Sequence, residues 1–384
     1  MRVLLTSTPG AGHIGPLLPF ARAIRRAGHD VLLAAPVSAQ ARVERAGLAY
    51  LSFGDPPKSE LDPVWAKVAG ATPDQANEIV IGELFAGVRA RAALPGIELA
   101  MDAWRPHVVL REAFEYGGAV AAEARRIPHA RIGIGLAMTE DYALSVAAPA
   151  VDELRAWAGL EPDPEGERLA SSPWLTLTPP SLESPDVPAP ARTLRFHDAA
   201  PRPRAMSAAG APSLVYVSFG SVAPTMGFFP GLYRAVIDAL AGLPARVVMT
   251  VGDAADPAAL GALPDNVRVE RWIPQAEILG EAAAMVGHGG FGTTLGALLT
   301  GVPQVVVPLF ADQPSNAERI EAIGAGLVAD PAGVRAAVER VLAEPAFRAA
   351  AARAAREAFT LPPIDAVGSF LAELAFKAKE RRAA

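Results

Sequence analysis

Cysteine is absent from this chain of 384 residues. Its absence excludes disulfide bonds and thiolate metal sites, and it fits a reducing compartment such as the cytoplasm. Histidine is scarce as well: the six that are present are scattered without the spacing of a metal-ligand set, and the sequence has no Asp-X-Asp motif. We therefore expect neither a metal nor another bound cofactor.

The chain also lacks any apolar run that approaches the roughly 20 residues needed to span a bilayer. The most apolar stretch, residues 298–310, is interrupted by Gly301, Pro303 and Pro308. Near the N-terminus, glycines from Gly10 onward end a short apolar run before it can serve as a signal peptide. These features predict a soluble, cytoplasmic protein without membrane insertion.

Positive charge is in the minority, with 35 lysines and arginines against 41 aspartates and glutamates and a net charge of −6. A nucleic-acid-binding domain needs a basic surface, so no nucleic-acid partner is expected. Hydrophobic residues at 51% supply a sizeable core, and charged residues at 20% argue against a disordered chain. The length suffices for two domains of about 150–200 residues.

The first part of the chain has the pattern of alternating strands and helices. Apolar runs at residues 2–6 and 30–35 predict strands, and the apolar spacing of residues 16–27 predicts a helix that Gly28 ends. Strands that are apolar throughout are typical of a parallel sheet covered on both faces. Two more strands are predicted at residues 108–110 and 130–134, with a helix at 116–125 between them.

A proline-rich segment at residues 179–212 disfavours regular helices and central strands, and we interpret it as a linker. After it the alternation resumes, with a helix predicted at residues 229–241. The strands predicted in this second half span residues 214–218, 246–251, 267–271, 285–287 and 304–307. Two successive alternating halves predict an α/β protein of two doubly wound, Rossmann-like domains that face each other across a cleft.

Residues 288–294, HGGFGTT, lie between a predicted strand and a predicted helix. Such a turn presents unpaired backbone N–H groups and the positive end of a helix dipole to an anion. Gly289, Gly290 and Gly292 let the backbone approach a phosphate closely, and His288 adds a side-chain donor. The turn therefore predicts a phosphate-binding site.

Six motifs in a fixed order support a family resemblance. They are TPGAGHIGP at 8–16, VSFGS at 217–221, RWIPQ at 271–275, HGGFGTT at 288–294, GVPQVVVP at 301–308 and ADQPSNA at 311–317. With these motifs the chain resembles GT-B glycosyltransferases, most of all the actinobacterial antibiotic enzymes that attach deoxysugars to natural products. The resemblance implies an acceptor-binding domain at 1–200, joined by a returning C-terminal helix at 366–384, and a donor-binding domain at 201–365.

The activity implied by the resemblance is inverting transfer of a deoxysugar from a dTDP-sugar to a hydroxyl of a hydrophobic natural-product aglycone. Nucleotide sugar and aglycone are then the small-molecule partners, and a homodimer is left open. His13 is the expected general base, because it lies in the first βα loop and an imidazole can take the proton of an acceptor hydroxyl. A role in capping the following helix is the alternative.

The base needs an acidic partner to orient it. Many relatives place an aspartate after the strand at 108–110, where this chain has Arg111 and Glu112. We predict Glu112 as the partner, with Glu115 as a competitor and a salt bridge between Glu112 and Arg111 as the structural alternative. For the acceptor, Phe85, Phe114 and Met138 are candidates for an apolar pocket.

On the donor side, Trp272 offers a flat face on which a pyrimidine can stack, worth about 1–3 kcal/mol, unless it is a core tryptophan. Gln275 can hydrogen-bond the base or sugar, and the resemblance assigns donor-sugar hydroxyls to Asp312 and Gln313. The turns contribute the other expected donor-binding residues, namely Ser218, Gly220, Ser221, His288, Gly289, Gly290, Gly292 and Thr293.

The nucleotide preference is predicted from Gly296. Relatives that use UDP-sugars commonly have a glutamate eight positions after the diphosphate histidine, where it accepts hydrogen bonds from the ribose hydroxyls. Gly296 occupies that position here and offers no side-chain acceptor, so dTDP-sugars should be preferred to UDP-sugars. Close helix packing is an alternative reason for a glycine at this position.

Other functions are compatible with parts of the pattern. A sugar-nucleotide epimerase or hydrolase with the GT-B architecture would need further acids and no acceptor site. A non-catalytic helper of a glycosyltransferase should have lost donor-site residues, whereas Trp272, Gln275 and His288 are present. A nicotinamide dehydrogenase is disfavoured because histidine and proline interrupt the turn at residues 10–16.

Overall fold

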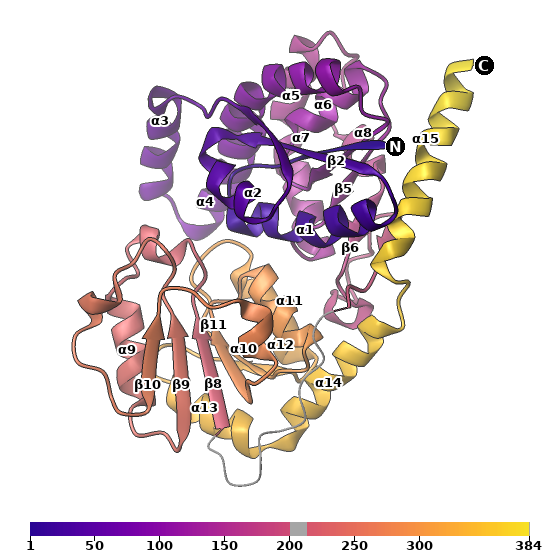
Figure 1. Ribbon diagram of the computed structural model, residues 1–384. Helices are drawn as coiled ribbons and strands as arrows, with labels where there is room; N and C mark the ends of the chain where they lie inside the picture. The colour runs from indigo at the N-terminus through magenta and orange to yellow at the C-terminus, as the bar shows by residue number, and fades with distance from the viewer. Residues whose placement is uncertain (200–212, 384) are drawn as a thin grey trace. The chain divides into compact units, whose positions relative to one another are not determined.

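The computed structural model describes residues 1–199 and 213–383. The chain divides into two compact units (Figure 1). Unit 1 comprises Met1–Leu177, Pro185–Asp198 and Pro362–Ala384, and unit 2 comprises Thr178–Ser184 and Ala199–Leu361. Part of the predicted linker, residues 200–212, lies outside the described residues.

Unit 1 contains a seven-stranded sheet in the order β3-β2-β1-β4-β5-β6-β7, with every pair parallel. The strands are β1 (Arg2–Thr6), β2 (Asp30–Pro36), β3 (Ala49–Phe53), β4 (Val108–Glu112), β5 (His129–Ile132), β6 (Trp174–Thr176) and β7 (Thr193–Arg195). The order reverses between β1 and β4, and ligands of doubly wound sheets bind at the carboxyl ends of the strands at such a point.

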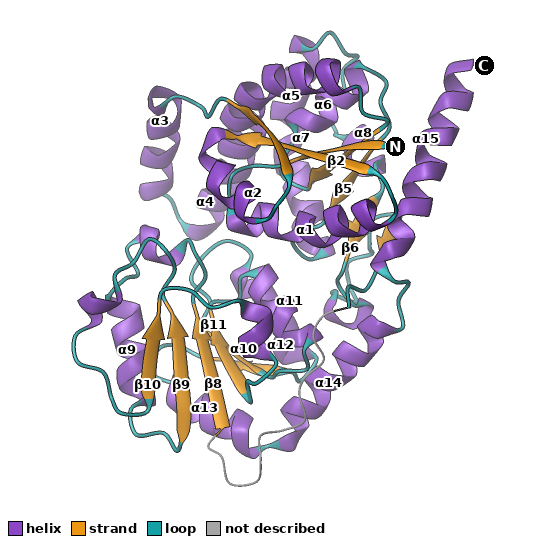
Figure 2. Ribbon diagram, viewed as in Figure 1, coloured by secondary structure: helices purple, strands orange, loops and turns teal. Residues whose placement is uncertain are grey.

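Helices cover both faces of this sheet (Figure 2). They are α1 (Ala11–Arg26), α2 (Gln40–Arg45), α3 (Lys58–Ala69), α4 (Pro73–Ile79), the π-helix η2 (Val80–Arg89), α5 (Ala90–Trp104), α6 (Gly117–Ala124), α7 (Ala137–Trp157), α8 (Glu167–Ser171) and α15 (Val367–Ala383). Val3 and Leu5 of β1 pack with α1 and α15, whereas Leu4 packs with α5, α6 and α7. Burial on both faces explains why this strand is apolar throughout.

Unit 2 repeats the plan with six parallel strands in the order β10-β9-β8-β11-β12-β13. The strands are β8 (Ser213–Ser218), β9 (Ala245–Thr250), β10 (Val267–Glu270), β11 (Ala284–Gly287), β12 (Gln304–Val306) and β13 (Gly326–Val328). The helices are α9 (Gly231–Leu240), α10 (Gln275–Leu279), α11 (Phe291–Leu299), α12 (Gln313–Ala322), α13 (Val334–Ala343) and α14 (Pro345–Phe359). The predicted α/β class with two doubly wound sheets is confirmed.

The prediction for the first helix was wrong in one respect that affects the site. The helix begins at Ala11 and not at Pro16, because the Gly10 carbonyl already accepts hydrogen bonds from the amides of His13 and Ile14. Pro16 lies inside the first turns, where its missing N–H costs only one helical bond. His13 therefore belongs to the first turn of α1 and not to the preceding loop.

Four strands escaped prediction for physical reasons. β3 is an edge strand, largely accessible to solvent, and β6 and β13 have only three residues each. Such short or exposed segments show little of the apolar pattern by which strands are recognised in a sequence. β7 falls within the predicted linker, at the edge of the sheet where neighbouring prolines are tolerated.

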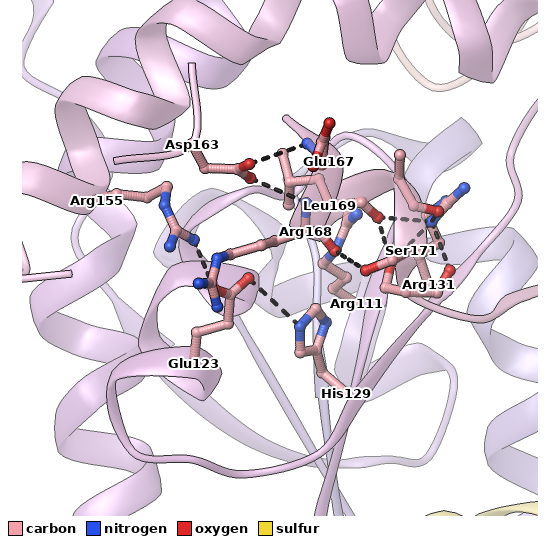
Figure 3. Close-up of polar contacts among 12 residues, drawn as sticks. Arg111, Glu123, His129, Arg131, Arg155, Asp163, Glu167, Arg168, Leu169 and Ser171 are labelled. Atoms are coloured by element: carbon pink, nitrogen blue, oxygen red, sulfur yellow. Dashed lines mark hydrogen bonds and ion pairs between the residues drawn. The ribbon is translucent and has the colours of Figure 1, made fainter. Parts of the chain in front are cut away.

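Charged and polar side chains of unit 1 contact one another in a group that includes Glu123, His129, Arg131 and Arg155 (Figure 3). Glu123 accepts a hydrogen bond of 2.5 Å from Arg155 and lies 3.7 Å from Nε2 of His129. Arg131 donates to the carbonyl oxygen of Leu169 at 2.8 Å. Burial lowers the pKa of His129 against the opposing effect of Glu123. These contacts join α6, α7 and the segment at α8 to the sheet and serve the fold of the unit.

Candidate active site

His13 and Glu112 form the central contact of unit 1, with 3.0 Å between His13 Nδ1 and Glu112 Oε1. Glu112 ends β4 and is wholly buried, while the His13 side chain keeps 17% of its surface exposed. The carboxylate also accepts hydrogen bonds from the Thr8 hydroxyl at 2.8 Å and from the Phe114 amide at 2.7 Å. Histidine and carboxylate are thus held at the carboxyl ends of β1 and β4.

The environment of Glu112 keeps its carboxyl group ionised. Burial works to raise its pKa, but the neighbouring His13 and the hydrogen bonds from His13, Phe114 and Thr8 hold that pKa below the ordinary value. An ionised carboxylate only accepts, so Nδ1 of His13 carries the hydrogen toward Glu112; in a neutral imidazole the lone pair then lies on Nε2. With such a carboxylate partner, an imidazole can accept a proton at Nε2.

The contacts of Arg111 and Glu115 match neither a salt bridge between Arg111 and Glu112 nor a pairing of Glu115 with His13. Arg111 donates to the backbone carbonyls of Glu112 and Ala113 and forms no ion pair with the Glu112 carboxylate within the described part of the chain. Glu115 is engaged separately, by the Thr6 hydroxyl and the Gly118 amide. Burial raises the pKa of Glu115 to about 7 despite these hydrogen bonds.

Gly10 creates the space that His13 occupies. A Cβ atom at position 10 would lie 2.6 Å from Cδ2 of His13, closer than carbon atoms can approach without displacement. A Cβ at the neighbouring Gly12 would meet nothing within 4 Å. The glycine at position 10 is therefore a steric requirement of the imidazole's placement.

Two of the three predicted acceptor residues surround the histidine. The rings of Phe85 and Phe114 lie 5.1 and 6.2 Å from the His13 ring and 5.6 Å from each other. Both line a pocket in unit 1. Met138, at the start of α7, is half-buried and does not line that pocket.

Sequence reasoning missed several residues of this pocket. Phe53, Asp55 and Arg89 line it. Phe53 lies on the edge strand that was not predicted, and Arg89 follows Phe85 by four positions on the π-helix. No motif marks these residues, and an apolar residue of a pocket has the same sequence signal as one of a core.

His288 follows β11 in unit 2 and is 8% exposed. Burial lowers its pKa to about 4, against a smaller opposing effect of the Ser218 backbone. The imidazole is therefore neutral at pH 7, and its ring N–H can donate a hydrogen bond without bringing a positive charge. The N-terminus of α11, three residues later, supplies the favourable dipole.

Glycines enclose this imidazole. Gly220 has φ +73°, and its added Cβ would lie 2.8 Å from Nε2 of His288. A Cβ at Gly290 would also collide with the His288 ring. Gly289 has φ +86°, and its Cβ would lie 2.9 Å from the carbonyl oxygen of Gln313. Any side chain at these positions would displace the histidine or the turn that carries it.

Asn316 holds the glycine turn in place. Its Nδ2 donates to the carbonyl oxygen of Gly289 and to Oδ2 of Asp312, each at 2.8 Å. The motif ADQPSNA contains Asn316, but its spacing does not reveal this role. Gln313 is buried, and its Oε1 accepts hydrogen bonds from two loop amides, so that oxygen is engaged within the protein.

The other residues predicted to bind the sugar donor are more exposed to solvent. Trp272 is 60% exposed, which excludes the core alternative and leaves a ring face free to stack. Gln275 begins α10 and is half-buried, while Ser221, Gly292 and Thr293 lie at or near the surface of their turns. The turns at Gly220, His288 and Gln313 lie close together, and Trp272 is not among the residues nearest to their glycines.

Comparison with known proteins decides the family. The N-terminal and C-terminal domain models of the erythromycin biosynthesis protein CIII-like family match residues 22–200 and 234–374. The L-demethylnoviosyl transferase of Streptomyces niveus is 36% identical over 369 residues, which cover 93% of this chain and 94% of that protein. The chain belongs to the erythromycin biosynthesis protein CIII-like family. It is a glycosyltransferase.

Solved structures agree with this membership. The glycosyltransferase SnogD from Streptomyces nogalater matches with a TM-score of 0.75 and 29% identity, covering 98% of this chain and 99% of that one. The rhamnosyltransferase SpnG complexed with thymidine diphosphate matches with a TM-score of 0.77 and 27% identity, over 97% and 100% of the two chains. The resemblance of this family member to GT-B antibiotic glycosyltransferases is thereby confirmed. Among its described residues, no helix is long and apolar enough to cross a membrane.

Proposed function

We propose that this glycosyltransferase moves a deoxysugar from a dTDP-sugar to a hydroxyl group of a hydrophobic natural-product acceptor, with inversion at the anomeric carbon. The observation that carries the proposal is the contact between His13 and Glu112 beside the rings of Phe85 and Phe114. A base, an acid that orients it and an aromatic surface for the acceptor are what such a transfer requires.

In the proposed reaction Nε2 of His13 removes the proton of the acceptor hydroxyl as its oxygen attacks the anomeric carbon. The bond from that carbon to the diphosphate oxygen breaks, and its electron pair leaves with dTDP. The ionised Glu112 holds the ring and stabilises the imidazolium that forms. A single displacement from the face opposite the diphosphate inverts the anomeric configuration.

Unit 2 supplies the donor side of the proposal. Neutral His288 and the amides at the start of α11 hydrogen-bond the diphosphate, whose negative charge grows as it leaves. Trp272 stacks on the thymine, and Asp312 holds a sugar hydroxyl. Thymidine diphosphate bound to the related SpnG supports this choice of nucleotide. We infer that these groups act without a metal ion, so chelation should leave turnover unchanged.

The inversion is tested by the anomeric configuration of the product. The enzyme is incubated with an α-configured dTDP-deoxysugar and a panel of hydroxylated polyketide and aromatic acceptors, and the product is analysed by NMR. The proposal predicts a β-linked glycoside. An α-linked product would contradict direct displacement, and epimerised or hydrolysed donor in the absence of acceptor would favour a sugar-nucleotide epimerase or hydrolase.

A further inference from the structure

A positively charged side chain, that of Arg89, lines the pocket beside His13. Arg89 ends the π-helix η2, and it lines the pocket together with Phe85, which precedes it by four residues. The Arg89 guanidinium lies over the Phe85 ring, 5.2 Å from the ring centroid. The same ring contacts His13, so one aromatic side chain bridges the proposed base and this cation. π-Helical turns are rare and frequently occur at functional sites.

Arg89 is half-buried, yet it makes no hydrogen bond or ion pair with any residue that the structure describes. Burial lowers its pKa, against the opposing attraction of Glu112 and Asp55. Charges withdrawn from water are normally paired, because an unpaired one loses its hydration without compensation. The planar group and its five N–H donors are therefore free to hold something else.

The acidic residues near Arg89 are committed to other donors. Asp55, which lines the pocket, accepts hydrogen bonds from the amide and the hydroxyl of Ser38. Glu115, also in the lining, is held by Thr6 and Gly118, and Glu112 is held by His13. Among the charged residues lining the pocket in the described chain, Arg89 is the one whose charge has no such partner.

We propose that Arg89 recognises an anionic oxygen group, such as a carboxylate or an ionised enol, on a planar aromatic acceptor that packs against Phe85 and Phe114. A guanidinium matches a carboxylate with two parallel hydrogen bonds, and its plane stacks on aromatic faces. The anionic group held by Arg89 would set which hydroxyl of the acceptor lies next to His13. This inference names the substrate class and so rests on the proposed function.

The proposed role of Arg89 can be tested by the binding of two small probe molecules, without a sugar donor and without turnover. A hydroxynaphthoate and its methyl ester share the ring and hydroxyl but differ in charge, and their affinities can be measured by calorimetry. Wild-type enzyme should bind the acid roughly tenfold or more tightly than the ester, as expected for charge-assisted hydrogen bonds. Arg89→Leu should abolish this ratio while retaining affinity for the ester, and Arg89→Lys should retain part of it.

Arg91→Leu is the matched control, because Arg91 is exposed two residues further along and does not line the pocket. It should leave the ratio unchanged. No preference for the acid in the wild type, no binding of either probe, or equal weakening of acid and ester by Arg89→Leu would overturn the proposal. An Arg89-dependent preference in an enzyme that glycosylates neither probe would support the anion site and count against the proposed transfer to such acceptors.

Discussion

Nδ1 of His13 lies 3.0 Å from Oε1 of Glu112, although 99 positions separate the two residues in the chain. The parallel pairing of β1 with β4 brings them together, because Thr6 at the end of β1 is in register with Arg111. Glu112 follows Arg111 at once, and the turn after β1 leads into α1 with His13 in its first turn. The pair is therefore a direct consequence of the order of strands in the sheet.

Gly10→Ala should lower turnover without unfolding the protein. The added methyl group would lie 2.6 Å from Cδ2 of His13 and would turn the imidazole away from Glu112. Gly10 has φ −65°, so alanine meets no backbone strain there. We expect a loss of roughly tenfold or more in kcat, since general-base catalysis is worth about 10²–10⁴-fold. Gly12→Ala, which meets nothing within 4 Å, is the control, and equal activity of the two variants would contradict the steric role.

His288→Ala should weaken binding of the nucleotide product. The change removes a buried donor enclosed by Gly220 and Gly290 and leaves the amides of α11 in place. We expect dTDP affinity to fall by roughly tenfold or more, as for loss of a hydrogen bond to a charged group. Calorimetry with dTDP measures it. Wild-type affinity in the variant would remove His288 from the diphosphate site.

Glu115→Gln should stabilise the protein more at high pH than at low pH. The pKa of Glu115 is raised in the folded state to about 7 from an ordinary 4.5, so ionisation costs stability as pH rises through this window. Below pH 4.5 the carboxyl is protonated in both states and imposes no cost. Each pKa unit corresponds to about 1.4 kcal/mol.

Thermal unfolding at pH 5 and pH 8 measures this effect, with the exposed Glu60→Gln as control. The Tm of Glu115→Gln relative to wild type should be higher at pH 8 than at pH 5. A difference that stays constant with pH would show that burial does not raise the pKa of this carboxyl.

Gly296→Glu should narrow the preference for dTDP over UDP. A Cβ at position 296 meets Gln275 and Leu279 at 3.5 and 3.6 Å, which is ordinary contact, so helix packing does not demand glycine here. A carboxylate on this face of α11 would accept hydrogen bonds from ribose hydroxyls, worth about 1.5–3 kcal/mol. The ratio of the two dissociation constants is the measurement. Gly296→Ala should leave the ratio at its wild-type value, and tighter UDP binding by the wild type would refute the preference itself.

The fold was largely predictable because its strands are buried on both faces and its turns carry glycine. Apolar runs predicted β1, β2, β4 and β8, whereas the solvent-accessible edge strand β3 left no comparable signal. The His13 and Glu112 contact was predicted from a family resemblance, and only the structure gives its distance.

Contacts that depend on tertiary packing could not be predicted from the sequence. Asn316 reaches back 27 positions to the Gly289 carbonyl, and nothing in the spacing of the two residues indicates that bond. Arg89 lies on a segment whose period suggests an ordinary amphipathic helix, so neither its π-helical turn nor its place in the pocket could be predicted. Met138 was a plausible pocket residue by composition, yet its backbone position places it outside the lining.

We propose His13 as the base that activates the acceptor. Its most direct test is the single-turnover rate of His13→Ala, measured with a saturating dTDP-sugar and an acceptor whose hydroxyl is not acidic. We expect a rate lower by about 10²–10⁴-fold, with dTDP affinity nearly unchanged, because the base acts on the acceptor and not on the diphosphate. A variant that transfers sugar at the wild-type rate would contradict it.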